Sequence, residues 1–418
     1  MGAILSEPVK AMVVERMATE SWSASTVTMQ GWRRTHEDAH ILSCADGACK
    51  DSGVFAVLDG HGGSDSAEAG SSMLQDRLER FARRGKVDAR AAMEQLQEAF
   101  IDVDARLRKE LPEEDRSGTT VVAAVITRPR PSEYCVQLAH CGDSRAVLCT
   151  GRKLVCTEDH KPQREDETQR IRAAGGTVEQ GPLGGGPLRV DGQLAVSRAL
   201  GDFHFKPEGT EPAECKVTAM PEVQTVTPCA AGDWLLLACD GVFDVMENEE
   251  VHEFISSRLS SAAADGGKIM ADLLQLCLEK GSKDNCTACL VQLAPSEPKP
   301  LSRELLQGPW EKAPAEVQAK YAEFFAAHGF EAEAMAVHST KDEAAAPSQA
   351  EASEPAAADE LAPPGQSRIV AFAKALQAMR SSRVIQGARG GAGEKDGGSG
   401  ANGSAAGSAK GGGGEGGR

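Results

Sequence analysis

Residues 55–63, FAVLDGHGG, join a short apolar run to an acid, a histidine and a group of glycines. The run before Asp59 is too short for a typical helix, so it predicts a buried strand. The glycines that follow allow the backbone to turn sharply. A distant stretch, residues 234–241 (WLLLACDG), has the same form and ends in Asp240. Two strands that each end in an acid can bring both carboxylates to one point, and paired carboxylates suit Mg²⁺ or Mn²⁺.

The overall composition indicates a folded, acidic protein. Its 418 residues, 41% of them hydrophobic, are enough for about two or three domains. The net charge of -17 argues against a nucleic-acid binder, because phosphate backbones need clustered Lys and Arg. The 12 cysteines have no framework spacing, which favours buried thiols in a reducing compartment. Without a secretory signal or an apolar run of spanning length, the sequence predicts an intracellular, cytoplasmic protein.

Cys286 and Cys289 form the single CxxC of the chain. Their neighbours predict a strand, and positions three apart on a strand point to opposite faces. No second CxxC is present to complete a zinc site. The pair is therefore interpreted as structural.

The spacing of apolar residues predicts the order of elements. A β-rich opening is expected over residues 22–58, and helices over 66–111. Residues 117–127 predict a buried strand, and residues 134–148 are expected to pair with it around the turn CGDSR. Beyond these, helices are expected at 167–174, 243–259 and 270–278, and strands at 220–226 and 287–293. The stretch GPLGGGPLRVDG (181–192) lacks the GK[ST] ending of a P-loop and predicts a flexible connector.

Three further acids lie where loops meet expected strands. Asp143, in the turn CGDSR, either satisfies local N–H groups or is another metal carboxylate. Glu37, in GWRRTHEDAH, is either part of a solvated strand end or an oxygen ligand, and an arginine beside it could bind a phosphate through its planar guanidinium. Asp284 precedes the last expected strand.

The two ends of the chain carry possible attachment signals. The opening MGAILS fits the myristoylation pattern with Gly2 as acceptor, although one acyl chain anchors only marginally. Residues 367–389, SRIVAFAKALQAMRSSRVIQGAR, combine an apolar helical face with basic residues and no acid. Such a helix either docks on its own protein or binds a membrane or a calmodulin-like partner. Residues 316–325 predict a helix that packs on the main domain.

Several motifs occur together in an order typical of one family. They are GWRRTHEDAH, FAVLDGHGG, SGTTVVAAVI, CGDSRAVL, EDHKP, RIRAAGGTV, LAVSRALGDF, LLLACDGVFDVM and DNCTACLV. Over about residues 20–294 the chain resembles the metal-dependent Ser/Thr phosphatases of type 2C. The resemblance implies an α+β fold, a four-layer α-β-β-α sandwich in which two central antiparallel sheets are flanked by helices.

This resemblance also divides the chain. The expected parts are an N-terminal segment (1–19), the catalytic domain (20–294), a C-terminal helical extension (295–340), a disordered linker (341–366), the basic amphipathic helix (367–389) and a Gly-rich disordered tail (390–418). A Gly/Pro insertion at 181–187 departs from the family pattern near the flap beside the active site, which leaves substrate preference open.

The resemblance assigns a role to each candidate residue. Asp59 resembles the carboxylate that bridges two Mg²⁺ or Mn²⁺ ions. Asp240 and Asp284 match the other ligands of one ion. Glu37 and the carbonyl of Gly60 match those of the second ion, and Asp38 lies beside them in the family pattern. Asp143 and Asp240 match the site of a weaker third ion. Arg33 matches the phosphate-binding arginine and His61 the general acid.

The implied reaction is hydrolysis of phosphoserine and phosphothreonine in protein substrates, by in-line attack of a hydroxide that bridges the two ions. No phospho-enzyme forms, so no Cys or Ser nucleophile is needed. The alternative is an inactive, metal-free binding module, which the presence of every matched acid disfavours. A metal-dependent nuclease is a more distant alternative, since no basic groove is evident. A monomer is expected.

Overall fold

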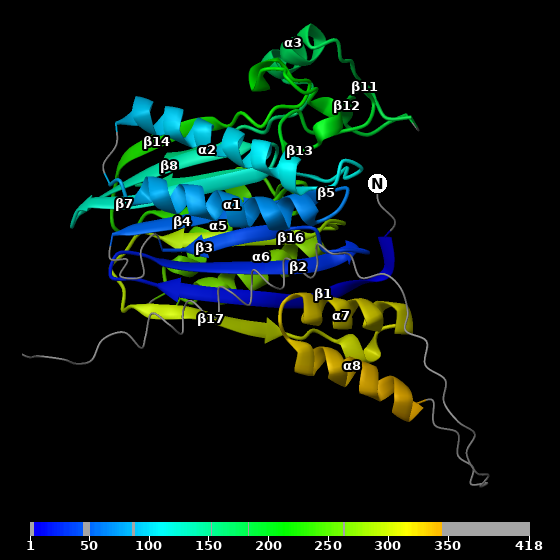
Figure 1. The fold of residues 1–418 in the computed structure, drawn as a ribbon. Helices are drawn as coiled ribbons and strands as arrows, with labels where there is room; N and C mark the ends of the chain where they lie inside the picture. The colour runs from blue at the N-terminus through cyan, green and yellow to red at the C-terminus, as the bar shows by residue number, and fades with distance from the viewer. Residues whose placement is uncertain are drawn as a thin grey trace, which may run out of the picture. The chain divides into compact units, whose positions relative to one another are not determined.

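Two antiparallel sheets packed face to face form the centre of the protein (Figure 1). The computed structural model describes residues 4–44, 51–85, 88–151, 153–182, 184–261 and 264–344. The predictions for Gly2, for the linker beyond residue 344, for the basic helix 367–389 and for the tail 390–418 therefore lie outside the described residues.

The larger sheet has seven strands. In spatial order they are β10 (Lys153–Cys156), β9 (Arg145–Thr150), β15 (Trp234–Ala238), β16 (Cys286–Gln292), β2 (Ser23–Arg33), β1 (Ile4–Ala18) and β17 (Lys299–Leu306). The second sheet has five: β14 (Glu222–Cys229), β8 (Glu133–Cys141), β7 (Val121–Arg130), β4 (Ser52–Leu58) and β3 (Ala39–Ser43). Two small sheets join β13 (Leu200–Gly201), β6 (Gly118–Thr119) and β5 (Gly60–His61), and β11 (Val178–Gln180) with β12 (Leu188–Val190).

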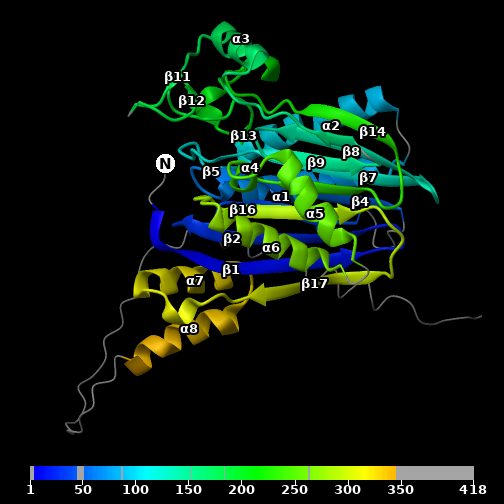
Figure 2. The same ribbon diagram turned by 180° about the vertical axis from the view of Figure 1, so that it is seen from behind.

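Helices cover the outer face of each sheet. α1 (Asp65–Ala82) and α2 (Ala89–Glu110) lie over the five-stranded sheet, and α5 (Asn248–Leu259) and α6 (Gly266–Glu279) over the seven-stranded one (Figure 2). The remaining helices are α3 (Glu165–Ala173), α4 (Asp240–Phe243), α7 (Ala315–Ala327) and α8 (Glu331–Ala344), with 3-10 turns at Phe203–Phe205, Pro212–Glu214 and Trp310–Lys312. The four-layer α-β-β-α sandwich implied by the resemblance is confirmed.

Side-chain alternation along β4 shows how the layers are built. Phe55 and Val57 face the seven-stranded sheet, whereas Val54, Ala56 and Leu58 face α1 and α2. Successive side chains on a strand point to opposite faces, so a strand that is buried on both sides reads as a continuous apolar run. The buried strand predicted before Asp59 is confirmed, and its burial on both faces fixes where the acid emerges.

The CxxC pair follows the same rule. Cys286 packs in the core between β16 and α6, whereas Cys289 packs in the core between the sheets. The prediction that the two thiols point to opposite faces of a strand is confirmed. Among the described cysteines no disulfide forms.

Two sequence predictions are corrected by the sheets. Residues 134–148 were expected to pair with 117–127 as one unit, but β8 pairs with β7 while β9 pairs with β15 in the other sheet. Gly142, with φ 112°, lies at the crossing, and a Cβ there would come within 2.5 Å of Thr120. The helix expected over 243–259 is likewise divided, because Glu247 has extended backbone and forms a capping box with Glu250 that starts α5.

The separate N-terminal segment expected at residues 1–19 is also corrected. Residues 4–18 form β1, which pairs with β2 on one side and β17 on the other. β17 belongs to the stretch expected to be a helical extension. Both strands carry charged or proline residues that obscure a period of two, so the sequence pattern did not predict them.

The C-terminal helices pack on β1. Val317, Tyr321, Phe324 and Phe325 of α7 are buried against Val9 and other apolar residues of β1. The hydroxyl of Tyr321 accepts a hydrogen bond from the backbone N–H of Lys10 at 2.9 Å. The predicted helix at 316–325 and its packing on the main domain are confirmed. Within the part of the chain that the structure describes, none of the helices is both long and apolar enough to cross a bilayer.

Candidate metal centre and active site

The two strand-end acids come from different sheets. Asp59 follows the last residue of β4 in the five-stranded sheet. Asp240 begins α4, and Cys239 alone separates it from Ala238, the last residue of β15 in the seven-stranded sheet. Because the sheets pack face to face, both carboxylates emerge at the same edge of the sandwich, as the sequence predicted.

Mutual repulsion among acids marks the centre of the site. Burial, followed by the negative charges of Asp240, Asp38 and Asp284, raises the pKa of Asp59 well above the usual range of an aspartate. Burial and the charges of Asp143 and Asp284 raise the pKa of Asp240 in the same direction. The structure therefore brings together all the aspartates that the sequence analysis selected.

Glu37 lies on the loop between β2 and β3. One of its carboxylate oxygens accepts from the Thr35 hydroxyl at 2.7 Å, and the other accepts from the backbone N–H of Gly63 at 3.2 Å. A Cβ at Gly60 would lie 2.2 Å from the carbonyl oxygen of Glu37, so the two backbones touch directly. Only glycine allows this approach, which places Gly60 and Glu37 side by side.

Arg33 ends β2 and forms an ion pair with Asp284. Burial alone would lower the pKa of its guanidinium, but the charges of Asp284, Asp240 and Asp59 raise it. A guanidinium has five N–H donors, so pairing with Asp284 leaves donors for a phosphate. Arg33 thus faces the same acids that Asp59 and Asp240 bring together.

His61 lies on β5, directly after Gly60. Its Nε2 is 2.7 Å from a carboxylate oxygen of Asp202. Burial alone would lower the pKa of His61, but the charge and hydrogen bond of Asp202, together with Asp143 and Glu37, raise it. With Nε2 bound to Asp202, Nδ1 is the ring atom that remains for a substrate.

Asp143 is part of the site but is not a free acid. The ammonium group of Lys161 forms an ion pair with it. Burial would lower the pKa of Lys161, but the charge of Asp143 and a hydrogen bond with it raise that pKa above the usual range of a lysine. The sequence left two interpretations open for Asp143. The structure favours a carboxylate that faces the acidic centre over a turn acid that is bound to local N–H groups.

Three residues that support the site were not selected from the sequence. They are Asp202, Lys161 and Asn285. The side chain of Asn285 accepts from the N–H of Glu37 at 3.0 Å and donates to the carbonyls of Gln30 and Thr35 at 2.8 and 3.0 Å. Asp202 and Lys161 lie inside the quoted motifs LAVSRALGDF and EDHKP, which were the available signal.

The residues present fit hard divalent cations. Asp38 and Asp240 each have a buried carboxylate oxygen without a hydrogen-bond partner among the described residues. Buried carboxylates that repel one another and have unsatisfied oxygens are stabilised by a bound cation, and hard cations such as Mg²⁺ and Mn²⁺ prefer oxygen ligands. The Arg33 and Lys161 cations are held at the edge of the group by Asp284 and Asp143.

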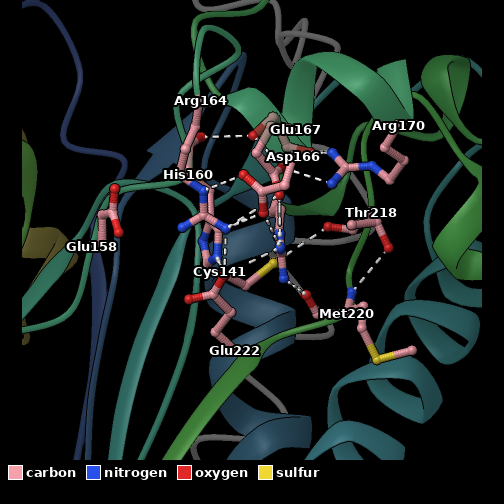
Figure 3. Close-up of polar contacts among 12 residues, drawn as sticks. Cys141, Glu158, His160, Arg164, Asp166, Glu167, Arg170, Thr218, Met220 and Glu222 are labelled. Atoms are coloured by element: carbon pink, nitrogen blue, oxygen red, sulfur yellow. Dashed lines mark hydrogen bonds and ion pairs between the residues drawn. The ribbon is translucent and has the colours of Figure 1, made fainter. Parts of the chain in front are cut away.

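A second polar cluster is built around Glu167, a buried residue of α3 (Figure 3). Glu167 is fully buried and forms ion pairs with Arg164, Arg170 and Arg198. Although burial alone would raise the pKa of Glu167, Arg198, Arg170 and the Ser197 hydroxyl hold it below the usual range. The cluster fixes the segment around β11 and β12 to the main fold.

His140, His160 and Glu222 offer ligand atoms within 4.8 Å of one another beside this cluster. Nε2 of His160 lies 3.3 Å from one Glu222 oxygen, but that oxygen also pairs with Arg164 and Arg198. The two imidazoles are stacked, with an interplanar angle of 20°. Lone pairs in nearly parallel rings do not converge on one ion, and the arginines oppose a cation. We interpret this group as part of the ionic network rather than as the metal centre.

The family profile of protein phosphatase 2C matches residues 22–286. The chain is similar to the mouse "Probable protein phosphatase 1N", with 39% identity over 68% of this chain and 67% of the relative. It is also similar to the Caenorhabditis elegans "Probable protein phosphatase 2C T23F11.1", with 38% identity over 70% of this chain and 80% of the relative. Among solved structures, a Toxoplasma gondii phosphatase superposes with a TM-score of 0.62 at 25% identity, over 70% of this chain and 99% of that one.

The profile match over residues 22–286 contains all the site residues described above, from Arg33 to Asn285. The chain belongs to the protein phosphatase 2C family. It is a Ser/Thr protein phosphatase, as the sequence motifs predicted, and the alternative of an inactive binding module is not favoured.

Proposed function

We propose that this phosphatase hydrolyses phosphoserine and phosphothreonine with two Mg²⁺ or Mn²⁺ ions held by the acids around Asp59 and Asp240. The observation that carries the proposal is the convergence of buried carboxylates from both sheets, close enough to raise one another's pKa. Such a cluster is costly in the folded protein unless cations neutralise it.

The proposed ligand sets are those implied by the family resemblance, and the positions of the acids support them. Asp59 would be a ligand shared by both ions, a role supported by its place among the charges of Asp240, Asp38 and Asp284. Asp240 and Asp284 would complete the protein ligands of one ion. The Glu37 carboxylate and the backbone carbonyl of Gly60 would serve the other ion, which the close approach of the two backbones supports.

The chain's own residues bind the phosphate and the leaving group. The remaining donors of Arg33 hold two phosphoryl oxygens and offset the charge that develops on them. His61 donates a proton from Nδ1 to the departing Ser or Thr oxygen, while Asp202 holds its Nε2. When bound, the divalent ions would supply an acidified water as the nucleophile.

A third, weaker ion is proposed at Asp143 and Asp240. The charge of Asp143 raises the pKa of Asp240, which supports their proximity. The ion pair between Asp143 and Lys161 competes with a cation at this position. Weak binding is the expected consequence, because Lys161 must first move away.

Metal-dependent phosphate release tests the proposal. We expect a phosphothreonine peptide to release phosphate in Mn²⁺ or Mg²⁺ and not in EDTA, and Asp59→Asn to lose nearly all turnover. Asp272→Asn is the matched control, because Asp272 is a partly exposed acid on α6 that pairs with Lys268. Full activity of Asp59→Asn, or activity that persists in EDTA, would contradict the proposed centre.

We also propose that the enzyme works inside the cell and associates reversibly with membranes. The support is the pattern MGAILS, with Gly2 as acyl acceptor, and the basic amphipathic stretch 367–389, which together would supply the two signals that stable anchoring needs. Full-length protein from a eukaryotic host should carry a myristoyl mass and bind anionic vesicles, and Gly2→Ala should weaken binding. Binding of residues 367–389 to Ca²⁺-calmodulin instead of vesicles would favour the partner interpretation.

A further inference from the structure

A continuous chain of hydrogen bonds runs from a partly buried histidine, His36, to the proposed metal centre. Nε2 of His36 lies 2.7 Å from the hydroxyl oxygen of Thr28. That oxygen lies 2.7 Å from the hydroxyl oxygen of Thr287. The Thr287 hydroxyl then donates to a carboxylate oxygen of Asp38 at 2.6 Å. The chain crosses from the β2–β3 loop through β2 and β16 and returns to the same loop.

The direction of each hydrogen bond follows from the carboxylate at which the series of hydrogen bonds ends. Asp38 in its carboxylate form can only accept, so the single proton of the Thr287 hydroxyl is directed at it. Thr287 must then accept from Thr28, and Thr28 in turn must accept from His36. His36 is therefore in the tautomer that carries its proton on Nε2.

Asp38 links this chain to the proposed metal ligands. Its second carboxylate oxygen is buried and has no hydrogen-bond partner among the described residues. The charges of Asp284 and Arg33 act on Asp38, and the charge of Asp38 acts on Asp59. One oxygen of Asp38 is thus fixed by Thr287, and the free oxygen is left for the centre.

The C-terminal extension packs against His36, at the other end of this chain of hydrogen bonds. The rings of Phe324 and His328 pack edge-on against His36, with centroid distances of 5.5 and 5.3 Å. At the opposite end of α7, Glu316 lies 3.4 Å from the guanidinium of Arg34. The loop is therefore contacted on both sides of Thr35, and the packed rings cover part of the His36 side chain.

We propose that His36 is a positioning residue of the metal centre: through the hydroxyls of Thr28 and Thr287 it fixes the orientation of Asp38, and α7 keeps it in place. The inference rests on the proposed function, because it places Asp38 beside the metal ligands. Partners outside the ligand shell that orient a metal-binding group commonly change metal affinity by about 10- to 100-fold.

Isosteric variants of the full-length protein separate this positioning role from an effect on packing. Thr28→Val removes the hydroxyl at the middle of the chain with little change in shape. His36→Phe keeps an aromatic ring against Phe324 but removes the Nε2 donor. Thr28→Ser restores the hydroxyl and is the rescue variant. Thr26→Val is the matched control, since Thr26 is buried two residues away on the same face of β2 and takes no part in the chain.

Mn²⁺ binding measured by calorimetry is the primary readout, with kcat and KM as a second. We expect Thr28→Val to bind Mn²⁺ about ten-fold more weakly than wild type and to lose kcat with KM unchanged. His36→Phe should show a smaller loss in the same direction. Thr28→Ser and Thr26→Val should bind Mn²⁺ within about two-fold of wild type.

The outcomes separate this inference from the proposed function. Wild-type Mn²⁺ affinity in Thr28→Val and His36→Phe, together with lost binding in Asp59→Asn, would overturn the positioning role alone. An equal loss in Thr28→Ser or Thr26→Val would assign the effect to packing and would also overturn it. Wild-type Mn²⁺ binding in Asp59→Asn itself would contradict the proposed centre.

Discussion

Nε2 of His61 lies 2.7 Å from a carboxylate oxygen of Asp202, and the backbone of Gly118 passes directly beside this pair. Asp202 is almost fully buried and has a left-handed backbone conformation, with φ 51°. A non-glycine residue in that region is held there by its surroundings, as is common at functional sites. The His61–Asp202 pair is thus built into the junction of β5, β6 and β13.

Replacing His61 should separate substrates by their leaving groups. His61→Gln removes the proton donor, so hydrolysis of a phosphothreonine peptide should fall by about 10²- to 10⁴-fold. p-Nitrophenyl phosphate should be affected much less, because its leaving group hardly needs a proton. Steady-state kinetics with both substrates in Mn²⁺ checks this expectation. Equal losses on the two substrates would remove His61 from the acid role.

A methyl group at Gly118 should disrupt the same pair without replacing any of the proposed metal ligands. A Cβ at Gly118 would lie 2.1 Å from the bound Asp202 oxygen and 2.4 Å from Nε2 of His61. Gly118→Ala should therefore lower activity on phosphothreonine peptides while Mn²⁺ affinity stays close to wild type. Gly151→Ala, at a turn where a Cβ meets nothing within 4 Å, tests for a general effect of replacing glycine. Unchanged activity in Gly118→Ala would show that the pair tolerates displacement.

The buried carboxylate of Glu167 should contribute strongly to stability. Glu167→Gln would leave three arginines around an uncharged side chain, and breaking a buried ion-pair network typically costs about 3–5 kcal/mol. Urea unfolding should show a decrease of that order. Glu165→Gln, at an exposed position on the same helix, should change stability by less than about 0.5 kcal/mol. Similar small changes in both variants would contradict the role given to Glu167.

Stability should fall in mild acid partly because of His140. Burial, and next the neighbouring His160, lower the pKa of His140 from 6.5 to about 4. Between these two pKa values the unfolded state binds a proton at His140 and the folded state does not. The contribution of neutral His140 to the free energy of unfolding is therefore complete above pH 6.5 and is lost as the pH falls toward 4. Its full size is on the order of 3 kcal/mol.

The variant His140→Gln isolates this contribution, since a glutamine can keep the hydrogen bond to the carbonyl of Glu158. Urea unfolding at pH 7 and pH 5 should show a smaller loss of stability for the variant than for wild type. The same loss in both proteins would mean that His140 is protonated alike in the folded and unfolded states.

The acids of the site were accessible to sequence reasoning because they follow strongly apolar strands. FAVL and WLLLA are buried on both faces, and an acid that follows such a strand within one or two residues emerges at the edge of a sheet. Which sheet each strand joins was not accessible from periodicity, and the resemblance supplied the layer order. The crossing at Gly142, which sends β8 and β9 to different sheets, depends on a close contact with Thr120 that only the fold reveals.

The residues that support the acids were harder to predict. Asp202, Lys161 and Asn285 act through partners that are distant in the sequence, and no local pattern marks such pairs. β17 was missed for a related reason. Most of its side chains are exposed, so its sequence KPLSRELL has no alternation, and its pairing with β1 stabilises it instead.

The central claim is that divalent ions bind between the sheets at Asp59 and Asp240, and anomalous diffraction from crystals grown with Mn²⁺ tests it most directly. The account predicts two strong anomalous peaks within coordination distance of Asp59, one also bound by Asp240 and Asp284 and the other by Glu37 and the Gly60 carbonyl. Well-ordered crystals with no peak at these acids, or with the strongest peak at His140, His160 and Glu222, would contradict it.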